Sequence, residues 1–499
     1  MSIQGRLSSV WEGTALPRFE AITSNQKTEV CVIGGGISGI SIAYKMAKRG
    51  HKVTLVEAFT IGSGQTGRTT AHLTCQLEEQ FVQLLKMHDL ETVQAFLDAH
   101  RSAIDIIETN VFSEHIDCDF KRLDGYLFQG RNFSEAKLRK EQDAGRKSGI
   151  NLDYVEKTPL LSGAVAGLRF PRQAQFNPIK YMAGLLAAMR KLDVTIFENT
   201  HVRHIENLDP ETTVISTDSG YDIEAKYLVV ATDSPINNRF YIHTKQFAYR
   251  TYAMAFTLEG PVADECLLWD TEDPYHYVRF VDGTLVVGCE DHRTGQDPDG
   301  DPFRNLEEWT RKNFAFVRDV KEKWSGQVFE PADQIGYIGK NPGPEKNIYI
   351  TTGQSGIGMT SATIASVLIP ELIEHGTHPW AAVFDPSRPP VRGLSDFVLE
   401  NVNVAYQYKD WVTGSEVESL QEIPEDHGSI MREGLIAKSC VYHEKGDCFE
   451  KKSAFCTHLG AVVHWNDIEK TWDCPAHGSR FNTHGAVIEG PAIDGLSER

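Results

Sequence analysis

The sequence predicts three folding units: an α/β domain with a parallel sheet, an antiparallel α+β domain inserted into it, and a small all-β domain at the C-terminal end. Residues 28–58 read as strand, Gly-rich turn, helix and strand. Apolar runs that alternate with polar residues between positions 240 and 330 are typical of antiparallel strands. From about residue 423 onward, short β runs are separated by glycines, which favours a compact β module.

The first unit rests on four apolar runs. The runs at 30–33 and 53–56 flank a helix in which apolar residues recur at helical spacing. Two further runs, at 227–232 and 347–353, have the continuous apolar character of buried parallel strands. Because these runs are far apart in sequence, the parallel sheet must be assembled from separated stretches of chain.

The second unit fills the gaps between those stretches. Residues 78–110 show a long helical pattern, and the runs at 275–280 and 284–290 predict antiparallel strands with one solvated face. The whole two-part unit is placed at 25–385, with parallel-sheet parts at about 25–77, 155–235 and 330–385 and inserted parts at about 78–154 and 236–329.

A linker region separates this unit from the C-terminal module. Residues 386–422 are predicted to contain a Pro-rich exit, a helix at 395–411 and the start of an exposed tether at 412–427. The β module then occupies residues 423–499.

Composition limits the kind of protein this is. The 499 residues carry 50 Lys and Arg against 69 Asp and Glu, a net charge of −19, which disfavours a general binder of nucleic acid or anionic membranes. The longest uncharged stretch, 347–370, reads as strand, Gly-rich turn and helix rather than as a membrane span. The start has no apolar signal region, and nine cysteines without framework spacing favour a reducing compartment, so we expect the cytoplasm.

A phosphate-binding turn lies in the first βαβ unit. Gly34, Gly36 and Gly39 form G-x-G-x-x-G directly after a strand and at the start of a helix. The glycines allow a tight turn and close approach of a pyrophosphate to the helix N-terminus, and Glu57 ends the next strand where it can bind a ribose diol. The motif predicts a dinucleotide site of the Rossmann type, and by itself it leaves NAD and FAD open.

Two further segments favour FAD. Residues 62–72 form a loop of small and hydroxyl residues around Arg68, and residues 353–360 form a Gly-rich turn between a strand and a helix. With these segments the chain resembles the D-amino-acid oxidase-like family of FAD-dependent oxidoreductases over residues 25–385. The FAD contacts that this resemblance implies are Gly34, Gly36, Ser38, Gly39, Glu57, Gly62, Gly64, Thr66, Gly67, Arg68, Thr70, Ala71, Val202, Gly353, Ser355, Gly356, Ile357 and Gly358.

The family resemblance also bears on how FAD is held and reduced. Some relatives attach flavin covalently through histidine or cysteine, but His72 lies about three residues from the implied anchor, so we expect non-covalent FAD. No second G-x-G-x-x-G occurs in the sequence, which favours an organic electron donor over NAD(P)H.

The C-terminal module carries a metal-ligand pattern. Cys456 and His458 form C-x-H, and Cys474 and His477 form C-x-x-H fifteen residues after the first pair. Two mixed pairs suit a [2Fe–2S] centre in which thiolates hold one iron and imidazoles the other. Zinc-finger spacing places both cysteines first, which differs from this order, although zinc at these ligands stays an alternative.

Residues 423–495 closely resemble the Rieske iron–sulfur domain. The resemblance implies that the two cysteines bind one iron, that the two histidines bind the other, and that Ser479 donates to a cluster sulfide. High-potential members have a disulfide and a tyrosine where this chain has Ala461, Ala476 and Phe481. Fewer hydrogen bonds to sulfur stabilise the reduced cluster less, so we expect a low-to-intermediate potential that is not strongly positive.

Two redox groups on one chain predict that the protein accepts two electrons at once from a donor and passes them on one at a time. A small organic donor, an amine or amino acid first of all, would reduce FAD, and single electrons would pass through the cluster to an acceptor protein or O₂. Two alternatives stay open: an O₂-using flavin oxidase with a structural Rieske module, and a non-enzymatic redox sensor or electron carrier.

No catalytic residue is identified from the sequence, and His72, Tyr277 and Arg279 are the candidates for catalysis or substrate binding. Alternation places Tyr275, Tyr277 and Arg279 on one face of a strand, where Arg279 could clamp a substrate carboxylate. The alternative is a solvated strand face with one salt bridge. His72 could face the flavin, or it could be an ordinary loop histidine.

Overall fold

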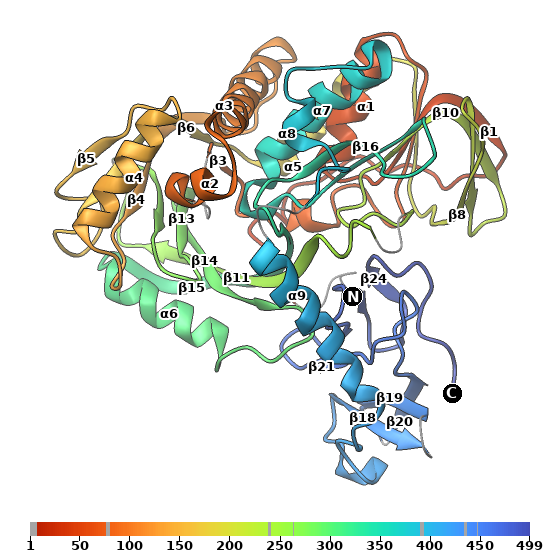
Figure 1. Cartoon of the computed structure of the whole chain (residues 1–499). Helices are drawn as coiled ribbons and strands as arrows, with labels where there is room; N and C mark the ends of the chain where they lie inside the picture. Colours follow the sequence, from red (N-terminus) through yellow and green to blue (C-terminus); the bar gives the residue numbers. More distant parts are fainter. Residues whose placement is uncertain are drawn as a thin grey trace.

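The structure is a computed structural model with three regions (Figure 1). A domain with helices α1, α3 and α7 lies beside a second domain of long strands, and the C-terminal β module packs below both. Helix α9 (Leu394–Gln407) runs along the surface toward the module. The residues described are 7–75, 80–237, 241–262, 264–389, 394–433, 437–446 and 448–499.

The first sheet has eight strands, and its main path runs β16-β17-β10-β1-β2-β7. The four pairs from β17 to β7 are parallel, so the predicted parallel sheet is confirmed. The strands are β1 (Gln26–Ile33), β2 (Val53–Val56), β7 (Val194–Phe197), β8 (Val202–Asp209), β9 (Thr212–Thr217), β10 (Asp222–Val230), β16 (Tyr337–Lys340) and β17 (Ile348–Thr352).

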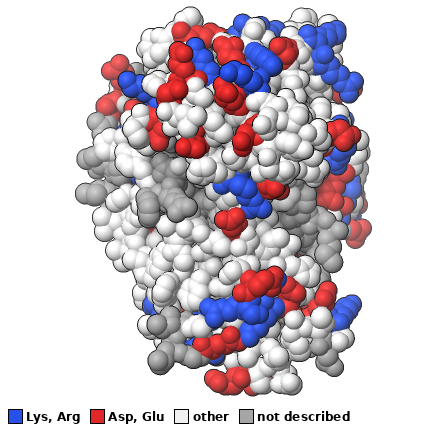
Figure 2. All heavy atoms as spheres, turned by 90° about the vertical axis from the view of Figure 1, so that its right-hand side faces the viewer, with Lys and Arg blue, Asp and Glu red and all other residues white. Residues whose placement is uncertain are grey.

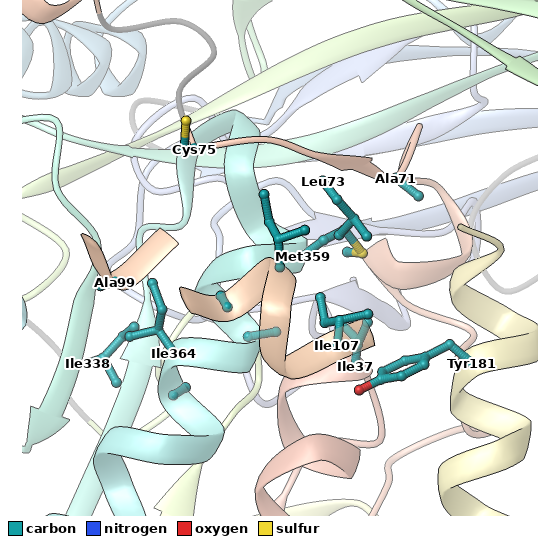
Figure 3. Close-up of a cluster of buried hydrophobic side chains, with 14 of the residues drawn as sticks. Ile37, Ala71, Leu73, Cys75, Ala99, Ile107, Tyr181, Ile338, Met359 and Ile364 are labelled. Atoms are coloured by element: carbon teal, nitrogen blue, oxygen red, sulfur yellow. The ribbon is translucent and has the colours of Figure 1, made fainter. Parts of the chain in front are cut away.

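The core of this domain forms where helices pack together against the sheet. Figure 3 shows its side chains, with Ile37 from α1 (Ile37–Lys48) near Ile107 from α3 (Leu90–Ser113). Tyr181 comes from α5 (Pro178–Met189), and Met359 and Ile364 come from α7 (Gly358–His375). All five side chains are buried, so the segment that carries the Gly-rich turn is anchored on a rigid base.

The second sheet has nine strands, with the order β15-β11-β14-β13-β12-β4-β6-β3 and β5 paired to β6. Its pairs are antiparallel except β12 with β4. The strands are β3 (His72–Leu73), β4 (Lys121–Phe128), β5 (Asp153–Val155), β6 (Gly167–Gln175), β11 (Gln246–Leu258), β12 (Leu267–Asp270), β13 (Tyr277–Val281), β14 (Thr284–Arg293) and β15 (Val317–Pro331).

Two sequence expectations about this second domain differ from the structure. A boundary at residue 155 assigns β6 to the parallel-sheet part, whereas β6 pairs with β4 in the nine-stranded sheet. The runs around β13 and β14 are antiparallel as predicted, but β13 is not half solvated. Four of its five residues are buried, because the N-terminal segment and the loop before β3 cover the face that alternation assigns to solvent.

The helical pattern predicted over 78–110 forms two helices. Helix α2 spans Phe81–Met87, and α3 begins after Asp89, whose side chain accepts a hydrogen bond from the backbone N–H of Thr92. This N-cap stabilises a new helix start and breaks the pattern. The remaining helices are α4 (Glu135–Lys147), α6 (Pro302–Asn313) and α8 (Ala381–Phe384).

The C-terminal module contains a three-stranded and a four-stranded antiparallel sheet, as its Gly-rich pattern predicts. Residues 412–427 are mostly exposed or half-buried, as expected of an exposed tether, but several of them also bind the module. The Glu416 backbone N–H donates to the Ile430 carbonyl, and Lys438 Nζ donates to the Thr413 hydroxyl at 2.9 Å. The strands are β18 (His427–Glu433), β19 (Ala437–Glu444), β20 (Cys448–Ser453), β21 (His464–Asn466), β22 (Thr471–Asp473), β23 (Arg480–Phe481) and β24 (Val487–Glu489).

The uncharged stretch forms β17, a short 3-10 turn (Ser355–Ile357) and α7, as predicted. The segment Ser355–His375 is the one described segment long and apolar enough to cross a membrane, but most of it is buried against the rest of the domain, which is typical of a core helix. Figure 2 shows Lys and Arg interspersed with Asp and Glu on one face, without a broad basic area on that face.

Candidate functional site

The Gly-rich turn between β1 and α1 has room only for glycines at two positions. Gly34 has φ +111°, and a Cβ there would lie 2.4 Å from the Ala231 carbonyl oxygen. A Cβ on Gly39 would lie 1.9 Å from the Gly34 carbonyl oxygen, so this glycine sets the close packing of α1 on β1. The turn therefore brings the first backbone N–H groups of α1 to the edge of the sheet.

The start of α1 can bind an anion. Gly36 is the N-cap residue and offers no side-chain cap, and the first turn holds no acidic residue. The helix N-terminus therefore keeps its partial positive charge for a ligand. Glu57 stands at the end of β2, where its carboxylate accepts hydrogen bonds from the N–H groups of Gly35 (2.6 Å) and Phe59 (2.9 Å). Burial raises the pKa of Glu57, and these N–H groups hold it in place.

These residues line a cavity of about 290 Å³. The sequence-predicted residues that line it are Gly34, Gly36, Ser38, Glu57, Gly64, Thr66, Arg68, Thr70, Val202, Ser355, Gly356 and Gly358. Six predicted residues stand behind the wall and shape it: Gly39, Gly62, Gly67, Ala71, Gly353 and Ile357. The sequence motifs thus meet in one elongated site, whose Gly-rich turn and acidic strand end fit the ADP half of FAD.

The second domain forms another part of the same cavity. Thr251 and Ala253 of β11, Trp324 of β15, and Tyr275 and Tyr277 beside β13 all line it. The Thr251 hydroxyl lies 2.7 Å from the Tyr277 hydroxyl. Trp324 is fully buried and donates its indole N–H to the Arg68 carbonyl at 2.7 Å, which fixes the loop predicted to contact flavin.

His72 and Arg279 lie outside the cavity lining. The His72 ring is buried, with Nδ1 3.1 Å from the Thr70 hydroxyl and Nε2 3.2 Å from the Val278 carbonyl. Burial, with a contribution from Arg279, lowers the pKa of His72 to about 3, so the ring is neutral. Its contacts are those of a loop histidine.

The Arg279 side chain is buried, so the expected solvated strand face is wrong for it. Its guanidinium donates to the carbonyls of Thr70 (2.8 Å), Ala71 (2.5 Å) and Phe176 (3.0 Å). These three bonds hold the loop against β13, and they direct the guanidinium away from a substrate carboxylate.

Sequence reasoning missed several lining residues, among them Thr251, Asp233, Asp291, Gln327 and Glu489. Asp233 had a readable signal, since it comes directly after the predicted strand at 227–232. Ligands in open α/β sheets bind at the carboxyl ends of such strands. Burial raises the pKa of Asp233 to about 7, and nearby Glu489 adds to the shift.

The four predicted cluster ligands meet at one end of the module. Cys456 and Cys474 are buried, and a hydrogen bond between their thiols lowers the pKa of Cys456. The rings of His458 and His477 lie 5.0 Å apart, and His477 Nδ1 is enclosed with no hydrogen-bond partner among the described residues. A thiol pair next to an imidazole pair fits a [2Fe–2S] cluster with two different ends.

Ser479 lies where the Rieske resemblance implies. Its hydroxyl accepts a hydrogen bond from the Ala492 N–H at 3.0 Å and also interacts with the Cys456 thiol. Ala461, Ala476 and Phe481 are buried around the ligand loops. The expected potential stays a prediction.

The end of the module that carries the cluster ligands packs on the second domain. The buried His243 ring lies 4.9 Å from the His458 ring and 6.0 Å from the His477 ring. Gln327 Nε2 of β15 donates to the Gly478 carbonyl at 2.9 Å. Residues 487–490 of the module, together with Ala492, form part of the cavity wall. One cavity therefore has walls from all three regions of the chain.

A buried ion network joins the domains beside this cavity. Glu469 of the module contacts both Arg250 of β11 and Arg480 of β23. Arg480 also contacts Asp473 at 3.0 Å and Glu489 at 3.2 Å. Four of the five side chains are at most 1% exposed, and Glu489 is 12% exposed. The network holds the module in its docked position.

Gly39→Ala is expected to weaken FAD binding at least tenfold, or about 1.4 kcal/mol. The added Cβ would force α1 away from β1 and move the N–H groups that hold the pyrophosphate. FAD retained after gel filtration measures the effect. Gly163→Ala is the control, because its Cβ would meet no atom within 4 Å. Equal FAD retention by the two variants would contradict the assigned role of Gly39.

Comparisons with known proteins agree with both cofactor sites. A family model described as FAD dependent oxidoreductase matches residues 29–372, and one described as Rieske [2Fe-2S] domain matches residues 416–498. The YhfW protein of Bacillus subtilis (strain 168), named as a Rieske 2Fe-2S iron-sulfur protein, is 30% identical over 499 residues. That match covers 97% of this chain and 96% of YhfW.

Two further proteins match the flavin part. Glycine oxidase of Bacillus subtilis (strain 168) is 28% identical over 370 residues, which cover 69% of this chain and 92% of the oxidase. The crystal structure of L-proline dehydrogenase from P. horikoshii has a TM-score of 0.62 at 20% identity and covers 73% of this chain and 98% of that chain. This second likeness shows the shared fold.

The family matches cover the Gly-rich turn, the late Gly-rich motif and all four ligands of the module. They also include residue 416, consistent with the hydrogen bonds that tie the segment before β18 to the module. The chain belongs to the FAD-dependent oxidoreductase family, carries a C-terminal Rieske domain, and binds FAD and a [2Fe–2S] cluster.

Proposed function

We propose that this oxidoreductase oxidises a small organic amine and passes the electrons singly through its Rieske cluster to an acceptor, either a separate protein or O₂. The observation that carries the proposal is the shared cavity. Residues 487–490 of the Rieske module line the same cavity as the Gly-rich turn, so the module that carries the cluster ligands also forms part of the wall of the FAD site.

Some residues of the cavity bind the cofactor, and others orient the loop and the donor beside it. When bound, FAD supplies a two-electron acceptor and the [2Fe–2S] cluster a one-electron acceptor. The α1 N-terminus and Glu57 bind the nucleotide end, while Trp324 fixes the loop around Arg68. Thr251 and Tyr277, hydrogen-bonded to each other, line the part of the cavity left for the donor.

The contact at His243 supports electron transfer within the chain. His243 comes just before β11 of the second domain, and its ring packs against the rings of both histidine ligands of the module. Close packing of these rings favours direct transfer, and the buried ion network keeps the two parts of the chain together. A freely moving module is therefore not needed for the cluster to be reduced.

The names of two relatives support an amine or amino-acid donor, since one is a glycine oxidase and the other an L-proline dehydrogenase. Non-covalent FAD fits the position of His72, which stands behind the cavity wall. A cytoplasmic location fits the nine free cysteines, of which Cys448 is the exposed one.

An anaerobic rapid-mixing experiment tests the proposal. Purified holoprotein is mixed with amines, amino acids and 2-hydroxy acids, while flavin absorbance and the electron paramagnetic resonance of the cluster are followed. We expect an amine to bleach the flavin first and the reduced-cluster signal to appear second. A bleached flavin with an unchanged cluster, together with O₂ consumption in air, would point to an oxidase with a structural module. No bleaching by any donor would favour a sensor or carrier.

A further inference from the structure

The β-sheet is irregular where it lines the donor part of the cavity. Arg250 of β11 opposes His292 of β14, whereas Tyr252 opposes Cys289. Two residues of β14, Glu290 and Asp291, therefore stand opposite the single residue Thr251, and Glu290 has φ +65°. Such a bulge turns a side chain out of the normal alternation, and bulges are common next to active sites.

The bulge presents the Asp291 carboxylate to the cavity. Asp291 lines the cavity together with Thr251, Tyr275 and Tyr277. Its Oδ1 atom is fully enclosed and has no hydrogen-bond partner among the described residues. An enclosed carboxylate oxygen without a partner is costly, and such atoms are often found at functional sites.

The electrostatics of this carboxylate favour a cationic ligand. Burial raises the pKa of Asp291 to about 7, the Thr251 hydroxyl opposes the shift, and Glu290 and Asp273 add to it. A bound cation would reverse this effect, because an opposite charge within a few ångströms stabilises the ionised carboxylate.

The cavity offers little to a substrate carboxylate. Among the described residues that line it, Arg68 is the only Lys or Arg, and it belongs to the loop that the family resemblance places on flavin. Arg279 is held by three backbone carbonyls outside the lining. The Tyr275 and Tyr277 rings, with centroids 5.4 Å apart, provide the aromatic surface that organic cations favour.

We infer that Asp291 binds the ammonium group of the donor, and that the donor is an amine without a carboxylate next to its nitrogen. The inference rests on the proposed function, because it names the substrate class of the same site. In this arrangement the ammonium group binds the Asp291 carboxylate, and the tyrosine rings contact the carbon skeleton. An α-amino acid would bring its own carboxylate against Asp291 without a cation to balance it.

Two ligands of one shape and opposite charge test the inference: tert-butylamine and pivalate. Neither has a hydrogen on the carbon that carries the charged group, so neither can reduce the flavin by hydride transfer. Binding to oxidised holoprotein at about pH 8, above the pKa of Asp291, is followed by the flavin difference spectrum. We expect wild-type protein to bind tert-butylamine at least tenfold more tightly than pivalate.

The variant Asp291→Asn is expected to raise the Kd of tert-butylamine at least tenfold without weakening pivalate. Glu290→Gln is the matched control. This neighbouring carboxylate lies outside the lining and accepts a hydrogen bond from Asn305 at 3.0 Å, so its neutralisation should leave both Kd values within about twofold. FAD content and thermal melting verify that each variant is folded.

The assignment would be overturned if wild-type protein preferred pivalate, bound both ligands equally or bound neither. It would also be overturned if the Asp291→Asn variant bound tert-butylamine as tightly as wild type. The wild-type comparison needs no variant and therefore holds even if Asp291→Asn fails to fold. Because the titration involves no electron transfer, failure of flavin-to-cluster transfer would leave its result intact.

Discussion

Cys474→Ala is expected to remove the iron–sulfur cluster almost completely while the protein keeps its FAD. Cys474 is buried beside Cys456, and alanine offers no thiolate to replace the lost iron ligand. The Gly-rich turn and Glu57 lie in another domain and are unchanged. Iron and acid-labile sulfide analysis measures the loss. Under the proposed function, a donor should still bleach the flavin, but the cluster signal should be absent.

Cys440→Ala is the matched control for that loss. Cys440 is a second cysteine of the module, equally buried, and its thiol interacts only weakly with the carbonyls of Lys452 (3.7 Å) and Ser453 (3.6 Å). It should keep both irons of the cluster, with a moderate loss of stability from the small cavity. Full iron content in Cys474→Ala, or equal iron loss in Cys440→Ala, would contradict the ligand assignment.

Glu469→Ala is expected to destabilise the docked module by about 3–5 kcal/mol. The carboxylate of Glu469 lies between the guanidiniums of Arg250 and Arg480, and all three side chains are at most 1% exposed. Its removal leaves two positive charges facing each other without solvent. Denaturant unfolding of the holoprotein, followed by the visible circular dichroism of the cluster, measures the change.

An exposed ion pair between the module and β8 of the parallel-sheet domain provides the control. Arg203 contacts Asp494 at 3.0 Å, and the two side chains are 40% and 76% exposed. Solvent screens such a pair, so Arg203→Ala should cost no more than about 1 kcal/mol. A similar small loss in both variants would mean that the buried network does not hold the module.

The stabilisation by Glu469 should also depend on pH. Burial alone would raise the pKa of Glu469, but Arg250 and Arg480 outweigh it and lower the pKa to about 2. The contribution is then complete above the ordinary value of about 4.5 and is lost as pH falls toward 2. The stability difference between wild type and Glu469→Gln should therefore shrink over this range.

The parts of the molecule that depend on neighbouring residues could be predicted from sequence. The βαβ unit, its Gly-rich turn and Glu57 fall within one short stretch, and each rests on local backbone geometry. The cluster ligands come from two tight turns, so their spacing carried the assignment. The break before α3 had a local signal as well, since Asp89 stands three residues before Thr92 at the helix start.

The rest depends on which segments pack together. The alternation of side chains along the strand correctly places Arg279 on the same face as Tyr277. It could not show that the loop around Thr70 covers that face. The bulge that presents Asp291 breaks the alternation itself. Likewise His243 gains its place beside the cluster ligands only after the module docks, and the sequence carries no spacing that links positions more than two hundred residues apart.

The module's part in the cavity wall bears on the order in which the protein matures. Residues 487–490 and Ala492 leave the ribosome long after the Gly-rich turn of residues 34–39 has emerged. A nascent chain that has already folded its parallel sheet therefore still lacks this part of the cavity wall. The wall of the cofactor cavity is therefore completed only after residue 492 has been synthesised and the module has docked.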